Sequence, residues 1–426
     1  MKLFQQLLVA GAAASMLAPL ASQATEVNID DINSYSSSKS SKNFDSKSFS
    51  NEDFAVLKGR VDGLEAIQNN FEAGAFSDTT TMDGKAVFTV GGVDWEDATK
   101  LDEAGGALSD AALFQYSYQL NLNTSFTGDD NLYVRLKTGN NVKNGTFGEQ
   151  TYGTYLSATD ASSSDLEVDK MWYSMPVGDK TTVFIGPKVE NYYMHGTTPS
   201  IYKPVLKQFT LGGNAAAYGA STSPGAGVSF DAGNGIVISS NFTTQDGEIS
   251  GLLSDEGATS WATQVGYTQP RYSVSAIVNM KYNGWEDSYF TTPNGKARAG
   301  LGDAGSTNIG LRGWWRPAET GTATPSVSVG YDTSETDATS NSNTTMYFVG
   351  LNWQDVVQSD DRIGVAFGQP QTREDEANTP FAWEAYYSFK MNDSVEITPT
   401  IFGATDRDAT TSADLTGVVV NTTFRF

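Results

Sequence analysis

The residues that most often carry out catalysis or bind metals are scarce in this sequence. The chain has 426 residues, with one histidine, His195, and no cysteine. A histidine-pair metal site, a thiol nucleophile and thiolate ligands for an iron–sulfur cluster are therefore excluded. A serine–histidine dyad would have to use His195, which we interpret instead as a loop residue lining a pore, within NYYMHGTT. The sequence predicts no catalytic residue, no cofactor and no metal.

Charged and aromatic side chains that could steer small solutes gather in one segment, from Pro187 to Gly225. A fully exposed loop has no need of so many aromatic residues, so this segment is the strongest candidate for controlling function. Its candidate residues are Lys188, Glu190, Tyr192, Tyr193, His195, Tyr202, Lys203 and Lys207. Four basic residues elsewhere complete the set, namely Arg135 and Lys137 in YVRLKTG and Arg312 and Arg316 in GLRGWWRP.

From Lys85 onward, apolar and polar residues alternate with the period of a β-strand. In AALFQYSYQLNLNTSF, Phe114 and Tyr116 share one parity with other apolar residues, while Gln115 and Ser117 take the other. The same pattern recurs in YSVSAIVNMKY, FAWEAYYSFKM and TGVVVNTTFRF. Sixteen such segments can be placed, starting near residues 86, 113, 132, 166, 181, 226, 236, 261, 272, 307, 324, 345, 362, 381, 395 and 416.

The connections between these predicted strands alternate in length. Those after even-numbered strands are short turns such as TGDD, VGD, DAGN and NDS, whereas those after odd-numbered strands are long. Short turns at one end and long loops at the other are typical of membrane-spanning antiparallel barrels. The region from Phe209 to Tyr218 is ambiguous, because it could also pass as a strand. We predict an all-β fold over residues 80–426, a 16-stranded antiparallel transmembrane β-barrel preceded by a short coiled-coil helix.

The residues before the barrel divide into three parts. Residues 1–24 have the pattern of a signal peptide that is cleaved after Ala24. Residues 25–52 are rich in Ser and Lys and predict a flexible linker. Within residues 53–74, Phe54, Leu57, Val61 and Leu64 follow the spacing of a coiled-coil seam. The alternative is a single helix that packs on another part of the chain.

The charge balance limits the partners of the chain. Its net charge of −23 argues against binding to nucleic acid, which requires a basic surface. After Leu20, no apolar run approaches the ~20 residues of a transmembrane helix. Arg or Lys placed toward the middle of a bilayer costs about 2–4 kcal/mol, so basic residues on the polar parity must face water inside the barrel. The apolar parity is then expected to contact outer-membrane lipid.

Several segments spread over the chain support a family resemblance. They are the leader MKLFQQLLVA, the coil FAVLKGRVDGLEA, the strand LEVDKMWYSMPVGD followed by TTVFIGP, and the late hairpin WEAYYSFKMNDSVEITPTIFGATD. With these segments the chain resembles the cyanobacterial members of the OprB-type, carbohydrate-selective porin family, also catalogued as iron-uptake porins. Such proteins usually carry a surface-layer-homology domain between leader and coil. Here the segment from Tyr35 to Asn51 takes its place, which puts attachment to the cell wall in doubt.

The resemblance implies a protein of the cell outer membrane that is not an enzyme and passes small hydrophilic solutes passively, with inorganic ions and carbohydrates as candidates. It also implies that the third external loop folds into the lumen, which would place Lys188, Lys203 and Lys207 near a constriction with Glu190. An aromatic final residue such as Phe426 is the usual recognition feature for barrel insertion in such proteins.

Two alternatives stay open at this point. An outer-membrane barrel could instead act through its external loops, as an adhesin or a hydrolase. The basic residues could also serve only to solvate the lumen, without selecting among solutes. If the third loop does fold inward, its three lysines against one glutamate predict a mild preference for anions, because a pore responds to charges within about 8–10 Å.

The coiled-coil seam predicts self-association, most simply as a homotrimer. Fewer than three heptads are marginal as an isolated helix, so the seam is useful only if copies of it meet. We expect deletion of residues 52–74 to weaken assembly while the barrel still folds. Sedimentation of the intact protein and of the deletion variant in mild detergent measures this. A monomeric intact protein would contradict the prediction.

Overall fold

The computed structural model describes most of the barrel region. The described residues are 79–96, 109–142, 145–148, 153–213, 215–219, 222–285, 304–337, 343–374, 376–406 and 414–426. The predicted signal peptide, linker and coiled coil all lie outside these ranges.

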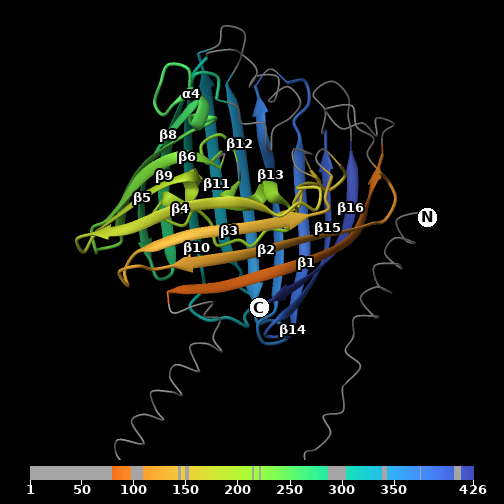
Figure 1. Ribbon diagram of the computed structural model, residues 1–426. Helices are drawn as coiled ribbons and strands as arrows, with labels where there is room; N and C mark the ends of the chain where they lie inside the picture. The colour runs from red at the N-terminus through yellow and green to blue at the C-terminus, as the bar shows by residue number, and fades with distance from the viewer. Residues whose placement is uncertain are drawn as a thin grey trace, which may run out of the picture.

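Sixteen antiparallel strands in this described part form one closed barrel, in which β1 pairs with β16 (Figure 1). The strands are β1 Thr80–Trp95, β2 Leu113–Thr124, β3 Asn131–Gly139, β4 Glu167–Val177, β5 Thr181–Val189, β6 Ser223–Asp231, β7 Ile236–Thr244, β8 Thr259–Gln269, β9 Tyr272–Tyr282, β10 Ser306–Trp315, β11 Ser326–Thr336, β12 Thr344–Gln354, β13 Arg362–Arg373, β14 Phe381–Asn392, β15 Val395–Thr405 and β16 Leu415–Arg425. The predicted strand number and antiparallel closure are confirmed.

The strands have a polar inner face and an apolar outer face, the reverse of a water-soluble protein. In β9 every second residue is exposed, including Val274 at 56% and Val278 at 40%. The residues between them, such as Ser273 and Asn279, are buried inside the barrel. This is the alternation that the sequence predicted for YSVSAIVNMKY, with the apolar parity outward.

The short helices all lie in links that follow odd-numbered strands. They are η1 Asn191–Met194, η2 Lys207–Gly212 and α4 Gly247–Ser250. Neither these helices nor any other in the described ranges is long and apolar enough to cross a membrane. Because η2 occupies the start of the ambiguous region Phe209–Tyr218, that region does not form a wall strand.

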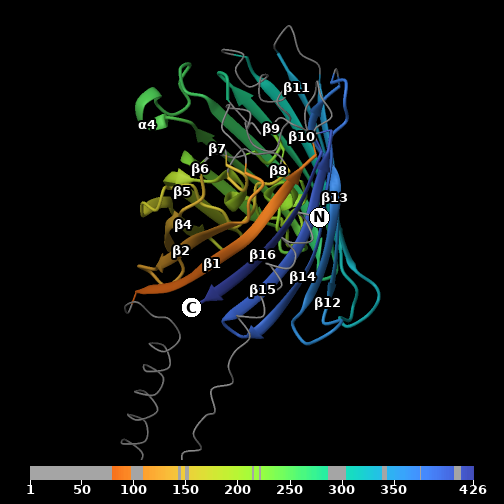
Figure 2. The ribbon, with the colours of Figure 1, turned by 90° about the vertical axis from the view of Figure 1, so that its right-hand side faces the viewer.

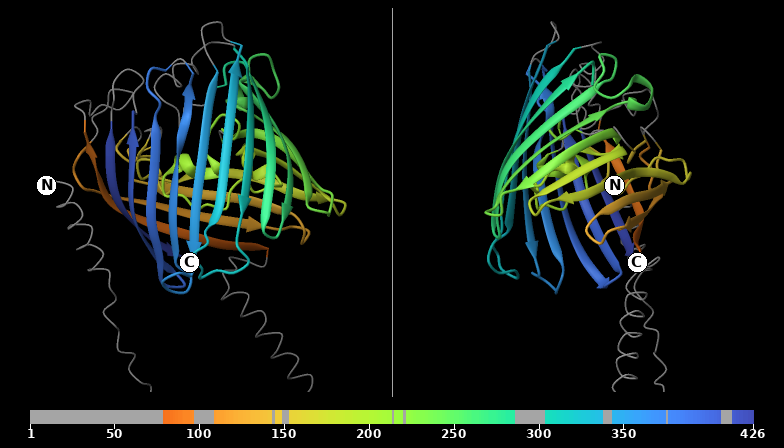
Figure 3. Two further views of the ribbon diagram at one scale, coloured as in Figure 1. Left: turned by 180° about the vertical axis from the view of Figure 1, so that it is seen from behind. Right: turned by 60° about the vertical axis from the view of Figure 1, so that its left-hand side comes forward.

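The predicted alternation of link lengths is interrupted between β10 and β13. The link after β10, residues 316–325, is longer than the link after β11, residues 337–343. The prediction of an unbroken alternation was therefore wrong for the links after β10 to β12, whereas the links after β13, β14 and β15 alternate again. The strand count was right. Figure 2 shows α4 at one end of the barrel and the C-terminus at the other, and Figure 3 shows β12–β16 from behind.

The junction between β1 and β16 depends on close packing around Gly84. The backbone N–H of Gly84 donates to the carbonyl of Phe426 at 2.8 Å. The Phe426 ring lies against Gly84 and stacks on the Tyr118 ring of β2, and the centroids of these two rings are 5.8 Å apart. A Cβ on residue 84 would lie 2.7 Å from the Phe426 ring, so only glycine allows this packing.

Two short turns are held by the same arrangement of an aspartate and a tyrosine. Asp130, just before β3, accepts two backbone N–H groups of its turn at 2.8 and 2.9 Å and the Tyr173 hydroxyl of β4 at 2.7 Å. Asp361, just before β13, accepts three backbone N–H groups at 2.9–3.0 Å and the Tyr387 hydroxyl of β14 at 3.0 Å. Each aspartate therefore links its own turn to the next strand of the wall.

Replacing Asp130 by Asn should destabilise the barrel, since an amide cannot accept all of these hydrogen bonds. Although desolvation raises the pKa of Asp130, hydrogen bonds from Thr127, Tyr173 and Ser125 outweigh it and hold that pKa below its usual range. Its stabilisation is therefore present above the unfolded-state pKa, about 4, and is lost as pH falls through the folded-state value. The free energy of unfolding should therefore decrease less between pH 7 and pH 3 in Asp130→Asn than in the unmodified protein.

Urea unfolding at pH 7 and pH 3, followed by tryptophan fluorescence, measures both effects. The matched control is Asp129→Asn, which removes the same charge from the neighbouring exposed residue. Equal unfolding midpoints for the two variants would show that the Asp130 contacts do not stabilise the barrel.

Candidate functional site

The described residues of the link between β5 and β6, namely 190–213, 215–219 and 222, lie inside the barrel; we call them the inner loop. Its apolar side chains pack on the inner wall, where Tyr202, Leu206 and Phe209 are almost completely buried against Phe348 and Tyr386. The third long link thus folds into the lumen, as the family resemblance implied. The loop forms a hydrophobic core with the wall, so it packs on one side of the barrel instead of standing free in the lumen.

Polar side chains on the inner face of consecutive strands hydrogen-bond the backbone of the inner loop. The strands β7–β14 each contribute at least one such residue, including Asn241, Gln264, Asn279, Arg312, Ser328, Asn352, Gln371 and Glu384. Their distances to loop atoms range from 2.6 to 3.3 Å. The loop backbone, which forms little regular secondary structure, therefore finds its hydrogen-bond partners on the wall.

Arg312 is the strongest of these contacts. Its guanidinium donates to the carbonyls of Leu211 and Gly213, each at 2.8 Å, and forms a buried ion pair with Asp332 of β11. It also stacks over the Tyr218 ring, 4.7 Å from the centroid. Arg312 was predicted to line the constriction, but the structure corrects this, because all of these contacts hold it inside the packed region.

Glu384 of β14 holds the inner loop at another point. Its carboxylate accepts the Tyr202 hydroxyl at 2.8 Å and the backbone N–H groups of Val205 and Leu206 at 3.2 and 2.6 Å. The sequence analysis did not select Glu384. The available signal was a single acidic residue on the inward parity of the otherwise apolar strand FAWEAYYSF.

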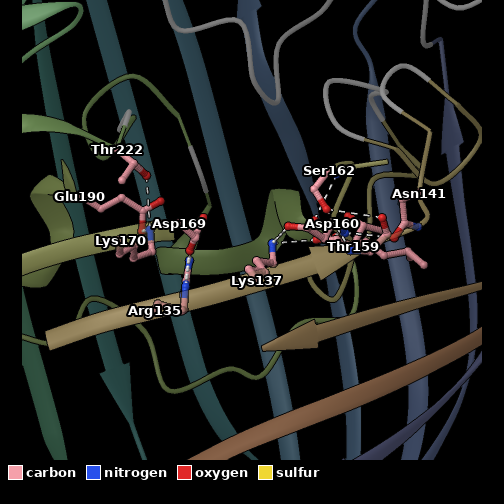
Figure 4. Close-up of polar contacts among 12 residues, drawn as sticks. Arg135, Lys137, Asn141, Thr159, Asp160, Ser162, Asp169, Lys170, Glu190 and Thr222 are labelled. Carbon is pink, nitrogen blue, oxygen red and sulfur yellow. Dashed lines mark hydrogen bonds and ion pairs between the residues drawn. The ribbon is translucent and has the colours of Figure 1, made fainter. Parts of the chain in front are cut away.

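The opposite wall, β3 and β4, carries a row of ion pairs, shown in Figure 4. They are Arg135 with Asp169, Lys137 with Asp160 at 2.9 Å, and Lys170 with Glu190. Asp160 belongs to the link after β3 and Glu190 begins the inner loop, so two of the pairs join a loop to the wall.

The acidic partners in these loops stay ionised at neutral pH. Burial raises the pKa of Glu190, but the charges of Lys170 and Lys207 outweigh it and lower that pKa to about 2. Burial likewise raises the pKa of Asp160, and Lys137 with Ser162 brings it below its usual range. Much of the positive charge predicted for this wall is therefore neutralised pairwise.

An aromatic cluster adjoins the row of ion pairs. Tyr193 lies 4.9 Å from the centroids of both Tyr192 and Trp172, and 6.5 Å from that of Tyr133. The ammonium of Lys170 lies 5.4 Å from the Tyr193 centroid. Tyr193 remains 39% exposed, so one face of this cluster is open to solvent.

The remaining candidates are distributed over different environments. Lys188 is exposed, and its ammonium donates to the carbonyl of Val168 at 2.9 Å. Lys203 is also exposed, near enough to Arg362 for the two charges to interact. The charge of Lys207 acts on both Glu190 and Lys85 of β1. Lys207 therefore acts on Glu190, the acid that pairs with Lys170 of β4.

His195 and Arg316 lie away from the ion-paired wall. His195 is half-buried beside β7, with Nδ1 3.1 Å from the Ser239 hydroxyl, and burial lowers its pKa to about 4, so it is neutral at pH 7. Arg316 follows the end of β10, where its Nε donates to the carbonyl of Pro270 at 2.7 Å. Arg316 was predicted to line the lumen, and the structure places it instead in the link of residues 316–325 that follows β10.

Comparisons with known proteins find relatives by sequence and similar β-barrels by structure. No protein-family model matches the chain. An uncharacterized protein of Nostoc sp. is 27% identical over 88% of this chain and 70% of its own length, and one of Synechocystis sp. is 26% identical over 80% and 68%. Two mutants of the Rhodopseudomonas blastica porin each have a TM-score of 0.50, with 10% and 9% identity, over 82% of this chain and 100% of theirs. This structural likeness supports the barrel fold.

Removing the Arg312 guanidinium should release the inner loop from the wall. Arg312→Met leaves Asp332 buried without its partner, which typically costs about 3–5 kcal/mol, and leaves two loop carbonyls without their donor. We expect faster amide hydrogen exchange in peptides covering residues 197–218. Arg316→Met, which removes a nearby exposed arginine, is the control and should leave exchange in this segment unchanged. Equal exchange in both variants would show that Arg312 does not anchor the loop.

Proposed function

We propose that the chain is an outer-membrane porin, a passive channel for small hydrophilic solutes. The observation that carries this proposal is the closed barrel with an exposed apolar outer face and a polar lumen. Large apolar side chains such as Val274, Leu311 and Val329 are 56%, 52% and 44% exposed on that outer face. Lipid would cover them at a gain of about 25 cal/mol per Å², and an outer membrane accommodates closed antiparallel barrels.

The proposed passage lies between the inner loop and the wall of β1–β4. The loop packs against β7–β14, so solutes are expected to move along the opposite, charged wall. Asp83, Asn121 and Arg135 lie on the inner face of that wall, and Asp83 accepts a hydrogen bond from Asn121 at 2.6 Å. Such a surface suits hydrated ions and polar solutes.

Inorganic ions are the first candidate solutes, and carbohydrates are the second. The observation favouring carbohydrates is the open aromatic face at Tyr193, next to the Arg135–Asp169 ion pair, because sugar rings stack on aromatic faces while their hydroxyls bind charged groups. Membership of the OprB-type family and assembly as a homotrimer belong to the same proposal. They rest on the quoted sequence segments and on the coiled-coil seam.

Conductance of the purified protein in a planar bilayer tests the channel. We expect stepwise, lasting current increases in potassium chloride, with current proportional to voltage at low voltage. A sample unfolded by heat before addition is the control. Folded protein that inserts into the bilayer without conducting would overturn the proposal and favour a barrel that acts through its external loops.

A further inference from the structure

Four inward-facing residues form a row across the junction of the barrel. Lys137 of β3 lies opposite Gln119 of β2, Gln119 lies opposite Lys85 of β1, and Lys85 lies opposite Arg425 of β16. Lys85 is half-buried on the inner face, on the same parity as the buried residues Val87 and Thr89. Three basic side chains thus occur in one row across four neighbouring strands.

The ends of the row have acidic partners, whereas its centre does not. Lys137 pairs with Asp160 at 2.9 Å, and Arg425 pairs with Glu396 at 3.1 Å. Within the ranges that the structure describes, Lys85 forms no ion pair. The nearest acid on its strand, Asp83, has its Oδ1 hydrogen-bonded to the side-chain amide of Asn121.

The surrounding cations reinforce one another at Lys85. The charges of Lys137, Arg135, Arg425 and Lys207 all act on it, and Lys207 belongs to the inner loop. Arg135, Lys137 and Arg425 each also pair with an acid, so Lys85 is the basic residue of the row that has no acidic partner among the described residues. Like charges directly opposite in an antiparallel pair, as in Lys85 and Arg425, are destabilising unless water or a counterion screens them.

We propose that this row is a binding site for small inorganic anions in the lumen, with Lys85 as its central cation. We further propose that it sets the preference of the channel for anions over cations. The inference rests on the proposed channel function. Lysine offers a compact charge with rotatable donors and no fixed shape, so the site selects by charge rather than by the form of the anion. Binding in a passage must also be weak enough for release, which a single unpaired ammonium allows.

The proposal departs from the expectation drawn from the three lysines of the third long link, of which Lys188 lies in β5 and Lys203 and Lys207 in the inner loop. Lys188 donates to a backbone carbonyl of β4, and the backbone of Lys203 is hydrogen-bonded to Asn352 of β12, so neither belongs to the row. A pore responds to charges within about a Debye length, 8–10 Å. Lys85 and Lys207 are therefore expected to matter more than Lys188 and Lys203.

Reversal potentials across a potassium chloride gradient test the proposal with matched charge swaps. We expect the unmodified protein to prefer chloride, and Lys85→Glu to lower the chloride-to-potassium permeability ratio roughly three- to tenfold. Lys180→Glu makes the same change of charge in the exposed turn between β4 and β5 and should leave the ratio unchanged. The double variant Lys188→Glu, Lys203→Glu should shift the ratio less than Lys85→Glu alone.

Lys85→Gln provides a second, milder variant in case the acidic side chain prevents folding. It should lower the ratio by a smaller factor and weaken the block of chloride current by added inorganic phosphate. If both Lys85 variants conduct with the same ratio and the same phosphate block as Lys180→Glu, the anion site is refuted while the channel stands. If the unmodified protein does not conduct at all, the proposed function itself fails.

Discussion

The inner loop is attached mainly to one half of the barrel, and under the proposed channel function this attachment decides where solutes would pass. A loop inside a wide barrel must satisfy its backbone hydrogen bonds, and this loop obtains them from polar side chains on β7–β14. Arg312 and Glu384 supply the charged contacts, and Tyr202 and Phe209 are buried in the hydrophobic core that the loop forms with the wall. Because an unsatisfied buried polar group costs about 1–3 kcal/mol, the loop and the wall constrain each other.

The strands could be predicted from the sequence because a barrel wall imposes a period of two on every segment. That period depends only on whether a residue faces lipid or lumen, so it is readable without knowing which strands are neighbours. The link lengths carried less information, as the long turn after β10 shows. Nothing in a local pattern fixes the length of a turn that faces solvent.

The contacts of the candidate site were harder to predict because they join residues far apart in the chain. Arg312 was selected for its charge and its parity, yet its role depends on Asp332 and on the carbonyls of the inner loop. Lys137 likewise depends on Asp160 in a different loop. Counting basic residues therefore overestimates the positive charge of a lumen. Lys85 was not selected from the sequence. Its place in the proposed anion site depends on Arg425, which is paired with it across the barrel junction although it lies near the other end of the sequence.

The one-sided core also has a mechanical consequence. A tube that is packed with side chains on one side is stiff on that side, because its wall cannot move inward without compressing a close-packed interior. Phe348, Tyr386 and Phe402 place this packing on β12, β14 and β15. On the wall of β3 and β4 the apolar packing is limited to a small cluster around Trp172, and ion pairs, which tolerate small displacements better than close-packed side chains do, supply other contacts with the loops. Fluctuations in the width of the lumen should therefore arise mainly from that wall, and would appear as noise in the electrical current of a single open molecule.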